Sequence, residues 1–80
     1  MPELRTTVTA PPGGVMTDEV GVITGELELA TACEDGAVRV AVRYAGANEW
    51  YRLSAADCAL HDPRDHEPLH NALAAVLDRP

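Results

Sequence analysis

At 80 residues the chain has the length of one small domain, whose single core leaves a narrow stability margin unless the chain is cross-linked, metallated or oligomeric. Hydrophobic residues make up 46% of the sequence, which excludes wholesale disorder, but with one Trp, two Tyr and no Phe the core has to be aliphatic. The net charge of −7 disfavours nucleic acids and anionic membranes as partners, because binding to either requires a basic patch.

We expect no targeting or membrane segment. Residues 1–10 contain one Arg and no apolar run of signal-peptide length, and no stretch approaches the roughly 20 apolar residues that span a bilayer. The protein is therefore expected to be cytoplasmic. In that compartment Cys33 and Cys58 are free thiols by default, and their separation matches neither a zinc ribbon nor a redox C-x-x-C motif.

The N-terminal part of the chain carries weak strand signals. Residues 4–9 are β-branched and polar, which is typical of an edge strand, and the Pro-Pro-Gly-Gly stretch at 11–14 breaks regular structure. Residues 1–14 are therefore either an edge strand or a loose arm, and residues 15–19 fit a turn or a strand end equally well. Residues 20–32 are strand-like, and we expect a bulge at Gly25 because the alternation is clean only after it.

The segment AVRVAVRY at 37–44 is the centre of the predicted sheet. Its strict alternation indicates a half-buried strand, and Asp35-Gly36 before it is a strong signal for a two-residue hairpin turn. In the register that this turn sets, apolar residues meet on one side and Glu28 faces Arg43 on the other, as a correct pairing requires. The predicted pairs are Glu34–Ala37, Cys33–Val38, Ala32–Arg39, Thr31–Val40, Ala30–Ala41, Leu29–Val42, Glu28–Arg43 and Leu27–Tyr44.

A third strand is expected at residues 49–54. A loop at Ala47-Asn48 would set Tyr44 against Tyr51 and Val42 against Leu53, so that apolar residues meet again. This register places Trp50 and Arg52 on the opposite side. A register shifted by one residue would instead bury Trp50.

The C-terminal part of the chain predicts helix. Residues 54–57 resemble a capping box and indicate a short helical turn, and Pro68 fits the first turn of a longer helix over 68–78, capped by Asp65 or Glu67. The apolar residues of that helix form one stripe, which we expect to lie across the inner face of the sheet. The stripe consists of Leu69, Leu73, Val76 and Leu77.

These elements predict one α+β domain over residues 1–80. It consists of a small antiparallel β-meander of three to five strands, with one C-terminal helix packed on one face. The core is expected to exclude Arg39 and Arg43. Its expected members are Leu27, Leu29, Val38, Val40, Val42, Leu53, Leu73 and Val76.

One group of residues has the chemistry of a metal site. Cys58, His61, His66 and His70 lie within 13 positions, and thiolate and imidazole are the ligands that zinc prefers. His66-Glu67-Pro68-Leu69-His70 also matches H-E-x-x-H, but Pro68 removes a backbone donor where that motif needs an established helix. The spacing matches no established zinc knuckle, so we expect no cofactor, with zinc as the alternative.

The sequence contains no convincing catalytic motif. Ser54 and Cys58 are the nucleophiles nearest a histidine, and neither has a G-x-S-x-G context. The acidic run from Asp57 to Glu67 lacks the order of a calcium loop, and Gly13-Gly14 is followed by no Lys-Ser/Thr of a phosphate loop. We therefore expect a protein that is not an enzyme.

The outer side of the sheet is the candidate interaction surface. There a small apolar patch of Ala30, Ala41 and Trp50 is surrounded by Glu26, Glu28, Arg39, Arg43 and Arg52. A thin core and an outward Trp favour a protein-interaction or accessory domain, with a protein partner or a second copy in a homodimer. The contact would use this face around Trp50 or an exposed edge strand. The alternatives are a small zinc-binding protein that uses the Cys/His group, and a ligand-binding protein or enzyme with a pocket between helix and sheet.

Overall fold

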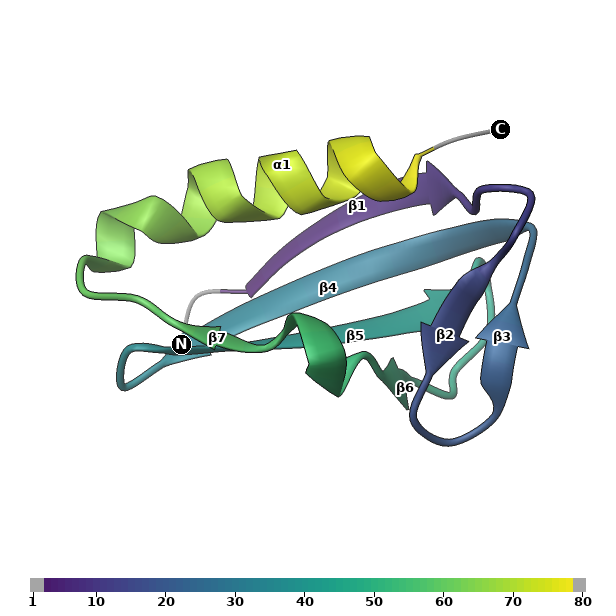
Figure 1. Cartoon of the computed structure of the whole chain (residues 1–80), viewed down its shortest axis with the longest axis horizontal. Helices are drawn as coiled ribbons and strands as arrows, with labels where there is room; N and C mark the ends of the chain where they lie inside the picture. The colour runs from purple at the N-terminus through teal and green to yellow at the C-terminus, as the bar shows by residue number, and fades with distance from the viewer. Residues whose placement is uncertain (1–2, 79–80) are drawn as a thin grey trace.

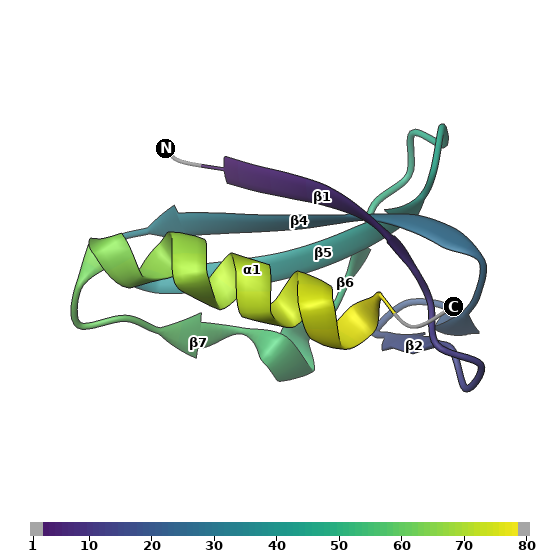
Figure 2. The ribbon, with the colours of Figure 1, turned by 90° about the horizontal axis from the view of Figure 1, so that it is seen from above.

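The structure is a computed structural model, and it describes residues 3–78. Its sheet has the strand order β1(Glu3–Thr9), β4(Glu26–Glu34), β5(Ala37–Tyr44), β6(Tyr51–Arg52), and β7(Cys58–Ala59) also pairs with β5. The helix α1(His66–Leu77) runs along the strands on one face, which we call the inner face (Figures 1 and 2). The opposite side is the outer face. The predicted α+β meander with one C-terminal helix is confirmed.

The pairing of β4 with β5 follows the predicted register at every position from Glu34–Ala37 to Leu27–Tyr44. The turn between them has Asp35 at φ 53° and Gly36 at φ 78°, the left-handed conformation that a tight hairpin turn requires and that this pair tolerates. The inner face of this hairpin is fully buried as far as Val42, whereas Tyr44 at the end of the strand is 42% exposed.

Strand β1 pairs with β4 along its whole length, so the expected edge strand is confirmed for residues 3–9. The chain then forms a separate hairpin of β2(Val15–Thr17) and β3(Gly21–Ile23) at one end of the sheet (Figure 1). The predicted bulge at Gly25 is wrong. This glycine adopts φ 91° in the bend between β3 and β4, where its carbonyl accepts a hydrogen bond from the Ala10 amide.

The pairing of β5 with β6 differs from the predicted register by two residues. Val42 faces Tyr51, and the Leu53 amide donates to the Val40 carbonyl at 2.9 Å, because residues 45–50 form an open loop instead of a two-residue turn. An even shift keeps every side chain on its predicted face. Leu53 is therefore buried, while Trp50 stays on the outer side.

Between β6 and β7, a side chain takes the place of a strand as the hydrogen-bond partner of β5. The 3₁₀ turn η1(Ser54–Ala56) carries the chain away from β5, so Val40 has no strand partner for its amide there. The Asp57 carboxylate accepts that amide hydrogen bond at 2.8 Å and also binds Arg52 at 2.5 Å. Asp57 thus replaces a missing backbone acceptor, which an unpaired amide in a sheet needs.

Helix α1 begins two residues before the expected start at Pro68. A second 3₁₀ turn, η2(Pro63–Asp65), leads into it, and the Asp62 carboxylate caps this turn by accepting a hydrogen bond from the Arg64 amide. Asp65, one of the two predicted caps, occupies the N-cap position of α1, but its side chain makes no capping hydrogen bond. Pro68 still lies in the first turn, where its missing amide has no partner to lose. The structure therefore accepts the proline without a kink.

The buried side of α1 differs from the predicted stripe. His66, His70 and Ala74 are buried, while the leucines at 69, 73 and 77 are partly buried beside them. Val76 was wrongly expected in the core: it is 59% exposed, because it follows Ala74 by two positions, or about 200° around the helix. No helix in residues 3–78 has the length and apolar character needed to cross a bilayer.

Candidate functional site

The outer face is centred on Trp50, and two arginine guanidinium groups lie over its indole ring. The guanidinium carbon of Arg43 is 4.4 Å from the ring centroid, and that of Arg5 is 5.2 Å away. Both distances are within the range of cation–π attraction, which also holds the ring in place against the sheet. The indole therefore presents a fixed aromatic surface even though it lies in a loop.

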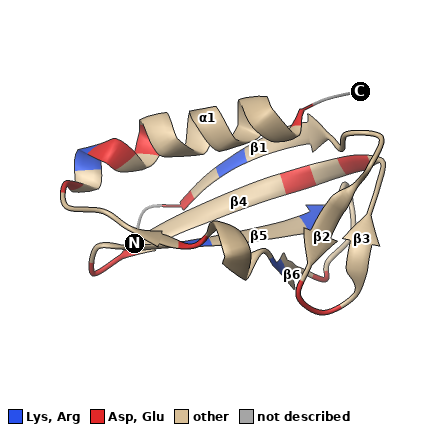
Figure 3. Cartoon of the chain, in the orientation of Figure 1, with Lys and Arg blue, Asp and Glu red and all other residues tan. Residues whose placement is uncertain are grey.

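Ion pairs neutralise most of the arginines on this face. Arg43 pairs with Glu28 at 2.6 Å, as the predicted register implied, and Arg5 pairs with Glu3 at 2.5 Å. Strand β4, which carries acidic residues, lies between β1 and β5, which carry arginine, and β6 with its arginine follows β5 (Figure 3). Arg39 has no ion pair within residues 3–78, and neither has Glu26, which is exposed.

A cavity of about 210 Å³ opens on the outer face, and we call it the outer pocket. Its floor contains Ala30, Ala32 and Ala41, whose small side chains leave the hollow, and Trp50 forms one wall. Arg39, Arg52, Arg5 and Glu3 also line it. The Nε of Arg52 is buried and has no hydrogen-bond partner. The outer pocket is on the side of the sheet opposite to the helix, not between the two.

The inner face contains a polar group inside the core, which we call the His–Thr cluster: Thr6, Thr31, His66 and His70. The hydroxyl oxygen of Thr31 is 2.8 Å from Nε2 of His66 and 2.7 Å from Nδ1 of His70, and Nε2 of His70 is 2.8 Å from the Thr6 hydroxyl. A hydroxyl donates one hydrogen bond and accepts others, so neutral imidazoles are satisfied here. Burial, and next the nearby His66, lower the pKa of His70 below its ordinary value of 6.5.

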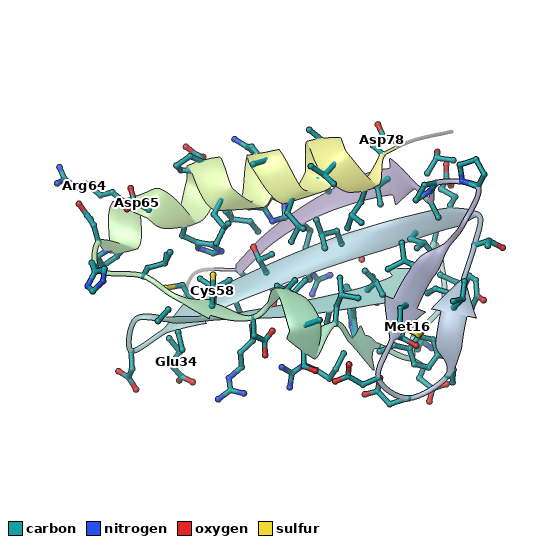
Figure 4. The ribbon with its side chains drawn as sticks, viewed as in Figure 1. Met16, Glu34, Cys58, Arg64, Asp65 and Asp78 are labelled. Carbon is teal, nitrogen blue, oxygen red and sulfur yellow. The ribbon has the colours of Figure 1, made fainter. Side chains whose placement is uncertain are left out.

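The structure brings together only part of the candidate metal group. His66 and His70 converge on Thr31, whereas Cys58 and His61 are exposed, Cys58 on β7 at the sheet edge (Figure 4). No three potential ligands converge within residues 3–78. In the H-E-x-x-H segment, the Thr31 hydroxyl lies between the two rings and Glu67 is exposed.

Sequence reasoning missed the His–Thr cluster, although one signal for it was present. In the predicted register Thr31 falls on the apolar side between Leu29 and Cys33, and a hydroxyl buried at such a position needs a polar partner. The helical spacing of His66 and His70 supplies two such partners on one face. The predicted stripe considered only the apolar residues of the helix and therefore left out both histidines.

The His–Thr cluster and the outer face differ in how far solvent can reach them. In the His–Thr cluster Thr31, His66 and His70 are buried, and the cluster joins α1 to β1 and β4. The outer face instead offers an aromatic ring, free charges and a pocket to solvent. Accessible, convergent groups are what binding requires, so the outer face is the candidate site. Comparisons with protein-family models, curated proteins and solved structures found no match to this chain, so the assignment of a function rests on the chemistry of these side chains.

Proposed function

We propose that the protein is an interaction domain that forms a homodimer through its outer face. The observation that carries this proposal is the arrangement of charge around Trp50. Arg39 and Glu26, which have no ion pair within the described chain, lie at opposite ends of the face, and the aromatic and alanine patch lies between them. Such a face is complementary to itself.

The β4–β5 register sets the distance between Arg39 and Glu26 on the outer face. Arg39 sits opposite Ala32, six residues along β4 from Glu26, or about 20 Å at 3.3 Å per residue. When two copies meet face to face with strand directions reversed, a two-fold axis midway between these positions, at the level of Leu29, places Arg39 of each copy over Glu26 of the other. Arg43 and Glu28 already pair within one chain, so the Arg39–Glu26 pair is the one that a second copy completes.

The size of the face indicates a dimer of modest affinity. Three strands of seven to nine residues, about 4.8 Å apart, and the two-residue strand β6 beside them cover a flat area on the order of 400 Å². A standard protein interface buries about 800 Å² on each partner. We therefore expect the dimer to dissociate on dilution, with the rate and the affinity both sensitive to salt through the peripheral charges.

Charge reversal tests the proposal. Arg39→Glu and Glu26→Arg should each weaken the dimer by roughly tenfold, because the pair occurs twice in a two-fold contact and reversal replaces attraction by repulsion. The double variant should recover most of the wild-type affinity. Sedimentation equilibrium over a dilution series, from micromolar to hundreds of micromolar, measures all three.

Matched controls are available at the start of α1. Arg64→Glu and Glu67→Arg make the same charge changes at exposed positions away from the outer face, and Arg64 points away from the molecule (Figure 4). These variants should dimerise like the wild type. A wild-type chain that stays monomeric throughout the series, or a double variant no better than the singles, would contradict the proposal.

A further inference from the structure

The outer pocket has hydrogen-bond donors that the chain itself does not use. Of the three arginines that line it, Arg5 is paired with Glu3 and Arg52 with Asp57, whereas Arg39 has no ion pair within residues 3–78. The Nε of Arg52 is buried without any hydrogen-bond partner, although its terminal nitrogen is paired. A buried donor without a partner is rare and destabilising in a folded protein. Because that nitrogen is closed off from the pocket, the exposed Arg39 is the donor that a ligand there can reach.

The rest of the pocket is apolar and flat. Ala30, Ala32 and Ala41 form the floor, and the indole of Trp50, held by its cation–π contacts, forms a wall. A ring can lie on such a surface and gain both burial and aromatic contact. The volume of about 210 Å³ is below the roughly 300–1,000 Å³ of sites for drug-sized ligands, so the pocket suits a body of one ring.

We propose that the outer pocket binds a small aromatic carboxylate of the size of benzoate. The carboxylate accepts hydrogen bonds from the Arg39 guanidinium, and the ring lies over the alanines against Trp50. Glu3 does not oppose an anion strongly, because Arg5 pairs with it at 2.5 Å. Guanidinium groups are well suited to carboxylates, since their planar donors match the two oxygens.

This binding site does not depend on the proposed homodimer. One copy contains every residue of the pocket. In a dimer, however, the ligand carboxylate and Glu26 of the second copy would compete for the same Arg39. Benzoate is therefore expected to weaken the dimer, which gives the interaction a means of regulation by a small molecule.

Nuclear magnetic resonance of the ¹⁵N-labelled chain tests the pocket directly. Trp50 is the only tryptophan in the chain, so its indole N–H signal is a unique reporter within the pocket. Titration with benzoate at concentrations where the chain is monomeric should give a saturable shift of this signal and of the Ala30 and Ala41 amides. Benzamide, which has the same ring without the charge, should bind at least about tenfold more weakly.

The same substitution at two positions distinguishes binding in the pocket from a general effect of lost positive charge. Arg39→Gln should weaken benzoate binding by at least about tenfold, whereas Arg64→Gln, at an exposed position on η2, should leave it unchanged. Equal shifts with benzamide, equal affinities of the two variants, or no saturable shift with millimolar benzoate would overturn the proposal. The molecular mass in solution, measured on the same samples, reports separately on the dimer. Failure of the benzoate site therefore does not imply failure of the homodimer, or the reverse.

Discussion

The Thr31 hydroxyl allows two histidine rings to be buried in the core. It is fully buried between aliphatic residues of β4 and supplies the hydrogen-bond partner for both His66 and His70. Replacement by Val keeps the shape of the side chain and removes only the hydroxyl. Two buried ring nitrogens would then lack a partner, and each such group costs about 1–3 kcal/mol.

Thr31→Val is therefore expected to lower the free energy of unfolding by about 2–4 kcal/mol. Thr7→Val is the matched control, because Thr7 is an exposed threonine in the middle of neighbouring strand β1. It should change stability by less than about 0.5 kcal/mol. Denaturant titration of both variants measures the difference, and equal losses would mean that the His–Thr cluster contributes nothing specific.

At the scale of the elements, α1 is fastened to the sheet at both ends by polar contacts. The His–Thr cluster holds its first turns against β1 and β4, and beyond its last turn the Asp78 carboxylate accepts a hydrogen bond from the Thr9 amide at 2.8 Å. Between these contacts the leucines pack against the core. The docking of the helix therefore depends partly on the protonation of buried imidazole.

This dependence predicts a loss of stability in mild acid. Burial lowers the pKa of folded His70 below 6.5, so below that pH the unfolded chain binds the proton more readily than the folded one does. The contribution is fully present above pH 6.5 and is lost as the pH falls from 6.5 towards the lowered pKa. Proton resonances of the three imidazoles should show a midpoint below 6.5 for His70, and the free energy of unfolding should fall over the same interval.

His70→Gln provides the control for this interval, because it removes the titrating group. The variant should be less stable near neutral pH and lose the pH dependence between 6.5 and the lowered pKa, whereas His61→Gln at an exposed position should retain it. A His70 midpoint at or above 6.5, or an unchanged slope in His70→Gln, would contradict the argument.

The sequence predicted local pairings well and distant ones less well. The β4–β5 register was correct because a two-residue turn and a strict alternation both determine it. The β5–β6 register was off by two residues, since the open loop at 45–50 contains no turn signal of comparable strength. The side of α1 that faces the core was also misjudged around Val76, because the buried positions include two histidines whose partners come from other strands.

The candidate site could be predicted in outline only. The outward position of Trp50 and the Glu28–Arg43 pair follow from strand alternation, and both are present. The outer pocket and the orphaned donor of Arg52 could not be foreseen, because they depend on where η1 carries Asp57 and on the path of the loop before β6. Such features depend on contacts between elements, which no local pattern encodes.

At the scale of the whole molecule, the two faces of the sheet have different chemistry. The inner face is apolar and covered by the helix, while the outer face carries Arg5, Arg39, Arg43 and Arg52 in a chain whose net charge is −7. Concentration of arginine around one tryptophan is typical of the centre of an interface, where these two residue types contribute most of the binding energy.

Trp50→Ala is therefore expected to affect assembly more than folding. Removal of an aromatic anchor from the centre of an interface typically costs about 2–4 kcal/mol, a weakening of the dimer by roughly thirtyfold or more. The fold should lose less, about 1 kcal/mol, because Trp50 lies outside the buried core and the cation–π pairs that it makes with Arg5 and Arg43 are weak at exposed sites. Tyr44→Ala, at an exposed aromatic position outside the outer pocket, is the control and should leave dimerisation nearly unchanged. Light scattering beside a denaturant melt of each variant compares the two free energies, and a larger loss in unfolding than in dissociation for Trp50→Ala would show that the indole stabilises the fold and not the dimer.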